Sequence, residues 1–146
     1  MSKPVVRPLE KDDYKQWRKL WTGYLEFYES SVPEEVYETT FARMFLDDVY
    51  EPRCLLSCDE NIPVGLVHFF QHRHCWRVEN VFYLQDLFVD PTVRGGGYGR
   101  ALIEAVYAEA DRLGCPTVYW TTATDNPAAK LYDQVAKRTK FIKYQR

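Results

Sequence analysis

The sequence predicts an α/β fold, an α+β arrangement in which a mixed β-sheet is flanked by helices, within a single domain over residues 1–146. A short β segment and two helical segments come first, three consecutive β segments follow, and a glycine-rich loop then leads into a long helix and another β segment. Short turns join antiparallel strands, whereas a helix between two strands makes the crossover that a parallel pair requires. Both kinds of pairing are therefore expected in one sheet.

The N-terminal part is expected to contain one strand and two helices. Residues 5–9 are a short β-prone segment, and Asp12-Asp13 precede a run in which apolar residues recur every three or four positions. This spacing predicts a helix with one buried stripe. The stripe consists of Trp17, Leu20, Trp21, Tyr24, Leu25 and Tyr28. Pro33 followed by two glutamates is typical of the start of a second helix.

The middle of the chain is expected to form three strands. They span residues 53–59, 62–71 and 81–89, and a tight turn at Glu60-Asn61 joins the first two. His68, in the second strand, is interpreted as a hydrogen-bonded structural histidine rather than a catalytic one, because its neighbours are apolar. Strand alternation in the third predicts two faces, with Leu84, Asp86 and Phe88 on one and Tyr83, Gln85, Leu87 and Val89 on the other.

The loop after residue 89 has the features of an anion-binding site. It has glycine at positions 95, 96, 97 and 99, Arg94 and Arg100 at its edges, and a helix expected from about Gly99 to Leu113. Glycine lets backbone N–H groups converge on an anion, and a helix N-terminus adds a positive field. A Walker loop would need Lys-Ser/Thr where Arg100-Ala101 stands, and a dinucleotide fingerprint would follow the first strand, so both are disfavoured.

The C-terminal part is expected to complete the sheet. Residues 117–122 are predicted to form a strand parallel to residues 81–89, because a helix makes the crossover between them. Asp125 or Asn126 is expected to cap a short helix. The alternating tail, residues 139–144, is predicted to form a final strand.

The composition argues against several kinds of partner. The formal net charge of −2 disfavours general binding to nucleic acid or to acidic membranes. No long apolar run or N-terminal leader is visible, so a cytoplasmic location is expected. The four cysteines lack paired C-x-x-C spacing, so we expect reduced thiols and predict no metal site.

Three motifs resemble those of the GNAT superfamily of N-acetyltransferases. Residues 94–99 match its pyrophosphate-binding signature, Q/R-x-x-G-x-G/A. Residues 83–89 resemble the Y-L-E-D-L-Y/F-V strand that precedes this signature in members acetylating polyamines, other small amines and histones. Residues 121–132 resemble the family's Asn followed by a short helix that carries a Tyr. The three motifs occur in the family's order along nearly the whole chain.

The resemblance implies a splayed mixed sheet of the GNAT acyl-CoA N-acyltransferase fold, with acetyl-CoA as co-substrate. It implies that backbone groups around Phe88 and Val89 pair with the pantetheine arm. Tyr132 is implied as the acid that protonates the departing thiolate, the alternative being a place in the core stripe. Asn126 is implied to bind the cofactor, to cap the helix, or both. The pyrophosphate is implied to lie among Arg94, Gly95, Gly97, Gly99 and Arg100.

The general base is less well defined by the resemblance. Amine-acetylating relatives often carry Glu where this chain has Gln85, and an amide cannot accept the proton. Asp86 is the first candidate among the neighbouring groups, followed by Glu79 and His68. Alternatively, the acceptor loses its proton to solvent through ordered water, or reacts from its neutral fraction.

The expected activity is transfer of an acetyl group from acetyl-CoA to a primary amine. The first expectation for the acceptor is a small molecule resembling a polyamine or an amino acid, and the alternative is a protein or histone lysine or an N-terminus. A non-catalytic acetyl-CoA sensor is a further hypothesis, motivated by Gln85. An acyltransferase that uses longer thioesters is another. The resemblance also implies a homodimer formed through the C-terminal strand region.

Overall fold

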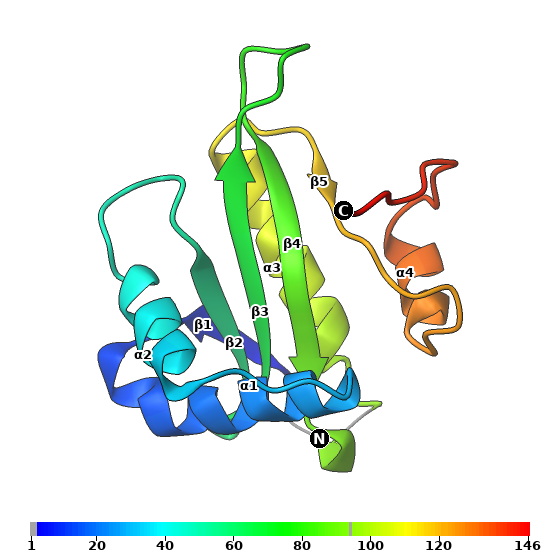
Figure 1. Cartoon of the computed structure of the whole chain (residues 1–146). Helices are drawn as coiled ribbons and strands as arrows, with labels where there is room; N and C mark the ends of the chain where they lie inside the picture. Colours follow the sequence, from blue (N-terminus) through cyan, green and yellow to red (C-terminus); the bar gives the residue numbers. More distant parts are fainter. Residues whose placement is uncertain (1–2, 94) are drawn as a thin grey trace.

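A computed structural model of the chain describes residues 3–93 and 95–146 and contains a five-stranded sheet with helices on both faces (Figure 1). β1 to β4 pair antiparallel with their neighbours, whereas β5 is parallel to β4. The predicted mixed sheet is therefore confirmed. Its strand order follows the sequence: β1 (Val5–Pro8), β2 (Arg53–Asp59), β3 (Ile62–His72), β4 (Val81–Val89) and β5 (Val118–Tyr119).

The main helices cover the two faces and one edge of the sheet. A 3₁₀ turn, η1 (Lys11–Asp13), leads into α1 (Tyr14–Phe27), and α2 (Glu34–Arg43) packs on the same face. The opposite face is covered by α3 (Tyr98–Arg112). In Figure 1, α4 (Ala129–Val135) lies next to the β5 edge. Within the described residues, no helix is both long and apolar enough to cross a membrane.

Each face of the sheet has its own apolar core. On the α1 face, the fully buried Trp17 packs with Trp21, in agreement with the stripe predicted for this helix. The predicted stripe was too long at its end, because Tyr28 follows the helix and is 45% exposed. Side chains from β2 and β3, such as Leu56 and Leu66, complete this core. On the other face, α3 buries its own stripe against β3 and β4, and this second core includes Val67, Phe69, Phe82, Leu84, Leu102, Ile103 and Val106.

A β-bulge interrupts β4 and changes which residues share a face. His68 of β3 pairs with Asp86, but Phe69 pairs with Leu84, so Gln85 is an extra residue in the strand. Leu84 therefore packs in the α3 core, whereas Asp86 contacts α1. The predicted uninterrupted alternation, which placed Leu84 and Asp86 on one face, is wrong because the bulge shifts the alternation by one residue.

Two other strand predictions differ from the structure. β5 covers only Val118–Tyr119 instead of residues 117–122, because the bulge bends β4 away from its parallel neighbour. Residues 139–144 do not form a strand. A strand needs a neighbour for its backbone groups, and this segment has none within the described part of the chain. Its apolar side chains are exposed, by 90% for Phe141 and 89% for Tyr144.

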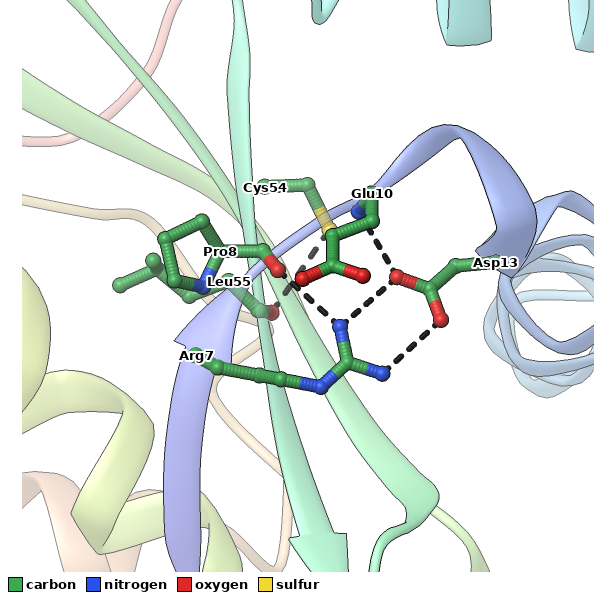
Figure 2. Close-up of polar contacts among 6 residues, drawn as sticks. All are labelled: Arg7, Pro8, Glu10, Asp13, Cys54 and Leu55. Atoms are coloured by element: carbon green, nitrogen blue, oxygen red, sulfur yellow. Dashed lines mark hydrogen bonds and ion pairs between the residues drawn. The ribbon is translucent and has the colours of Figure 1, made fainter.

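An ion pair fixes the entry of the chain into α1 (Figure 2). The Arg7 guanidinium donates to both carboxylate oxygens of Asp13, at 2.8 and 2.9 Å, and the Glu10 N–H donates to Asp13 at 2.7 Å. Asp13 is nearly buried, and its hydrogen bonds with Arg7 lower its pKa below the ordinary value of 3.8. This bidentate pair ties β1 to the start of the first helix.

Replacing Asp13 with Asn is expected to lower the free energy of unfolding at pH 7 by about 1–3 kcal/mol, because Arg7 loses a charged partner. Since the folded-state pKa of Asp13 lies below the unfolded value of 3.8, the contribution of the pair is present above that pH. It is lost as the pH falls through the folded-state pKa. Urea unfolding of both proteins at neutral pH and near pH 3 measures the two effects.

The control for this experiment is Glu109→Gln, which breaks an exposed pair with Arg112. We expect this control to change the free energy of unfolding by less than about 0.5 kcal/mol. Equal losses of stability in Asp13→Asn and Glu109→Gln would contradict the structural role of the first pair.

Candidate active site

The loop between β4 and α3 leaves open space beside two glycines. Gly95 and Gly97 have φ angles of +92° and +81°, and a Cβ added to either would meet nothing within 4 Å. Gly97 is the N-cap of α3, and no side chain caps this helix. The first N–H groups of α3 have no partner inside the helix and face the loop, as in phosphate-binding helix termini. Arg94 lies outside the described residues.

Arg100 and Gly99 belong to the first turn of α3. The Arg100 guanidinium is exposed and donates to Glu104 (Nε to Oε1, 3.0 Å) and to Gln134 of α4 (Nη1 to Oε1, 3.3 Å). A Cβ added to Gly99 would lie 3.6 Å from Val89, which is an ordinary contact. Exposed contacts like those of Arg100 are weak. An anion in the loop can therefore recruit this side chain at small cost.

Beyond Tyr83, the third residue of β4, the edge of the strand that faces β5 is unpaired. β5 pairs with Phe82 and Tyr83 only, so the rest of this edge has no strand partner among the residues that the structure describes. The Phe88 ring lies on α1, where a Cβ at Gly23 would come within 2.8 Å of it. On its other edge, the backbone of Phe88 and Val89 pairs with β3. An extended ligand can add to the first edge in the manner of a strand.

Asp86 lies in a buried network on the α1 face of the sheet. Its Oδ2 atom accepts the indole N–H of Trp21 at 3.2 Å and lies 2.8 Å from Nδ1 of His68. Nε2 of His68 accepts the indole N–H of Trp17 at 2.9 Å. The pKa of the Tyr24 hydroxyl is raised, mainly because the group is buried and secondly because the charge of the Asp86 carboxylate is close to it. The prediction that His68 is a hydrogen-bonded core histidine is confirmed.

The structure separates the candidates for the general base. Asp86 and His68 are in direct contact. Gln85, the bulge residue between paired positions of β4, is exposed. Glu79 lies just before β4, and its charge raises the pKa of Cys115. It is therefore at the opposite end of the strand from the glycine loop. Of the three candidates, only Asp86 and His68 are brought together.

Tyr132, on α4, is partly buried and packs against the core on the α3 face of the sheet, as the core-stripe alternative also predicted. Burial, with a smaller contribution from Tyr28, raises the pKa of Tyr132 to about 12. Its ring meets that of Trp120 edge to face, with the centroids 5.4 Å apart. The phenol is therefore a partly buried proton donor that keeps its proton at neutral pH.

Asn126 stabilises the turn before α4. Its Oδ1 accepts the backbone N–H of Ala128 at 2.9 Å, and its Nδ2 donates to the Thr122 hydroxyl at 2.9 Å. Its carbonyl also accepts the N–H of Ala129, at 3.0 Å. Because these bonds close a turn first, α4 begins only at Ala129, three residues after Asn126. The predicted helix cap at Asp125 or Asn126 is therefore wrong: Ala128 is the N-cap of α4, and Asn126 closes the turn before it.

Sequence reasoning missed that α1 contributes polar groups to the site. It treated Trp17, Trp21 and Tyr24 only as an apolar stripe. In the structure each of them has a polar atom beside His68 or Asp86. A buried indole N–H needs an acceptor. Two buried tryptophans on one stripe were therefore the signal that could have pointed to polar partners in the sheet.

Residues 15–136 match the model of the acetyltransferase (GNAT) family. The chain belongs to this family. It is an acetyl-CoA-dependent N-acetyltransferase, and both the predicted fold and the predicted enzyme class are confirmed.

Two relatives of this acetyltransferase are named for free amino acids. The D-amino-acid N-acetyltransferase HPA3 of Saccharomyces cerevisiae is 41% identical over 145 residues, which are 97% of this chain and 89% of that protein. The L-ornithine N5-acetyltransferase NATA1 of Arabidopsis thaliana is 27% identical over 116 residues, 79% of this chain and 46% of that protein.

A solved structure supports the fold of the acetyltransferase. The aminoglycoside N-acetyltransferase AAC(6')-Iy in complex with CoA superposes with a TM-score of 0.81 at 18% identity, covering 100% of this chain and 95% of that chain.

Replacing Gly97 with Ala is expected to weaken CoA binding by at least about tenfold, or about 1.4 kcal/mol. The added Cβ would occupy the open space beside the first N–H groups of α3. Isothermal titration calorimetry with CoA measures the change.

Gly114→Ala is a matched control, because Gly114 also has a positive φ, +72°, and open space, but lies just after the other end of α3. Both variants are expected to lose about 1–2 kcal/mol of stability from backbone strain. Only Gly97→Ala is expected to lose CoA affinity. Equal affinities in the two variants would show that the loop does not hold the coenzyme.

Proposed function

We propose that this acetyltransferase acetylates the amino group of a free amino acid, with D-amino acids as the first class to test. The observation that carries the proposal is the 41% identity, over 97% of the chain, with the yeast enzyme named for D-amino acids. The second relative is named for L-ornithine, which is also a free amino acid. A buried carboxylate, Asp86, provides an anionic group for a cationic acceptor.

The loop and the open edge of β4 are the proposed acetyl-CoA site. Backbone groups of Phe88 and Val89 would pair with the pantetheine arm, because β5 leaves this edge of β4 unpaired. Asn126 would border the arm from the turn before α4, although its side chain already bonds within that turn. The pyrophosphate would lie among Arg94, Gly95, Gly97, Gly99 and Arg100. When bound, acetyl-CoA supplies a thioester whose carbonyl carbon the amine attacks.

Two side chains would move the protons that the reaction requires. The acceptor amine arrives mostly as an ammonium and must lose a proton before it can attack. Asp86, held on the α1 face, attracts this cation and takes up its proton. Tyr132 donates a proton to the sulfur that leaves, since its raised pKa of about 12 keeps the phenol protonated.

Replacing Tyr132 with Phe is expected to lower kcat by about 10²- to 10⁴-fold, because a general acid is removed while the ring remains. CoA affinity is expected to stay within about twofold, well below the 1.4 kcal/mol of a tenfold change. Because the pKa of Tyr132 is raised to about 12, ionisation of this phenol should not reduce kcat of the wild type up to about pH 10. Steady-state kinetics and calorimetry measure these quantities.

Tyr50→Phe, which changes an exposed tyrosine outside the site, is the control and should match the wild type. A Tyr132→Phe variant with wild-type kcat would remove Tyr132 from the proton transfer.

A panel of acceptors tests the substrate class. Acetyl transfer is measured by release of the CoA thiol with matched D- and L-amino acids, L-ornithine, a polyamine and a basic peptide. Saturable turnover of free amino acids, with the D-forms preferred, is expected. Turnover of the basic peptide alone would overturn the proposal in favour of a protein acetyltransferase. Turnover of the polyamine alone would overturn it in favour of polyamines as the acceptor class.

We also propose that the acetyltransferase is a homodimer formed through residues 139–144. Phe141, Ile142 and Tyr144 are 90%, 75% and 89% exposed, and burial of such side chains against a second copy would stabilise the pair. Light scattering is expected to give a dimer mass, and Phe141→Ser with Ile142→Ser is expected to reduce it. A monomer mass for the wild type at micromolar concentration would contradict the proposal.

A further inference from the structure

We propose that Trp17 and His68 are positioning residues for Asp86. In this proposal the Trp17 indole holds His68 as the neutral tautomer with its proton on Nδ1, and His68 in turn holds the Asp86 carboxylate charged and in place for the acceptor amine. The inference rests on the proposed role of Asp86 at that amine. It adds a helix residue and a strand residue that do not themselves contact the reacting atoms.

The tautomer follows from the kinds of atoms that face one another. An indole nitrogen can only donate a hydrogen bond, so the Nε2 atom of His68, 2.9 Å from Nε1 of Trp17, must be the acceptor. A neutral imidazole has one N–H, which must then be on Nδ1. That nitrogen lies 2.8 Å from Oδ2 of Asp86 and donates to it. The whole chain of bonds is shielded, because Trp17 is 0% and His68 3% exposed.

This arrangement excludes His68 as the general base. A proton added to Nε2 would point at the N–H of Trp17, and a buried hydrogen bond would be replaced by two donors that face each other. The carboxylate of Asp86 is meanwhile bonded by two neutral donors, His68 and the Trp21 indole. Neutral donors stabilise the charged form of a carboxylate without cancelling its charge. The charge of Asp86 therefore remains available to attract an ammonium.

The other titratable groups around this network do not compete with it between pH 5 and 8. Cys54 of β2, which pairs with His68 in the sheet, has a pKa raised well above its ordinary value by burial. Tyr24 of α1 also has a raised pKa, so both groups stay neutral in this range. From α2, the Tyr37 ring packs on Trp17 and its hydroxyl bonds to Thr22. Two more groups contribute to these raised pKa values. Tyr83 of β4 raises the pKa of Tyr24, and Asp13, which is paired with Arg7, raises the pKa of Cys54.

The test removes single indole N–H groups while keeping an aromatic ring. Trp17→Phe frees Nε2 of His68, which can then accept a proton as the pH falls and form a cation beside Asp86. Relative to the wild type, its kcat/KM for the amine is expected to fall by up to about tenfold per pH unit below this new ionisation. At higher pH the two proteins should be similar.

Two matched variants separate the pH-dependent fall in kcat/KM from a loss of core packing or of a hydrogen-bond donor to Asp86. Trp21→Phe removes a donor to Asp86 but leaves the bond between Trp17 and His68, so it should change kcat/KM by one factor at every pH. Trp76→Phe, at an 89% exposed residue, should match the wild type. A constant ratio for Trp17→Phe as well would overturn the positioning role.

A spectroscopic measurement decides the tautomer without any activity assay. In long-range ¹H–¹⁵N spectra, with His68→Gln used for assignment, the wild type is expected to show the Nδ1–H form of His68 from pH 5 to 8. An Nε2–H form, or an imidazolium at pH 7, overturns the inference even if Trp17→Phe does not fold. Failure of the wild type to acetylate any amine would instead refute the proposed function and leave the tautomer to this measurement.

Discussion

The bulge at Gln85 is the constraint on which the arrangement of the site depends. One extra residue reverses the alternation of β4, so Tyr83 and Asp86 both lie toward α1, whereas Leu84 and Leu87 both pack toward α3. A bulge also bends and twists its strand. Consequently β5 stays paired with β4 for two residues only. The same local irregularity thus turns a carboxylate toward the first helix and leaves unpaired the strand edge at which we propose that the coenzyme binds.

Among the described residues, two carboxylates are nearly buried, and their hydrogen-bond partners differ in charge. Asp13 is bonded by the Arg7 guanidinium, which cancels its charge and fixes the chain at the start of α1. Asp86 is bonded by indole and imidazole groups, which orient it but leave its charge in place. Removing a buried charge from water without a counter-ion is costly. In the proposed site, the ammonium group of the acceptor would supply the missing counter-ion and offset this cost.

The sequence predicted the parts of this protein that local chemistry determines. The limits of β4, the helix after the glycine loop and the stripe on α1 depend on residues close together in the chain, and they were predicted nearly to the residue. The bulge was not predicted, because it depends on how β4 pairs with β3. The tail at Phe141 has strand-like alternation but lacks a neighbour, which alternation cannot reveal. The contact of Trp17 with His68 joins residues 51 positions apart and needed the fold.

The close approach of Gly23 to the Phe88 ring has a consequence for ligand recognition. With 2.8 Å between that ring and a hypothetical Cβ, α1 rests directly on the end of β4. Helix and strand therefore form one closely packed wall, with the proposed coenzyme edge on the strand, Tyr24 on the helix and Tyr28 just after it. An acceptor that meets this wall does not have to order it. Such preorganisation lowers the entropy lost on binding, and it favours small ligands, which have few contacts with which to offset that loss.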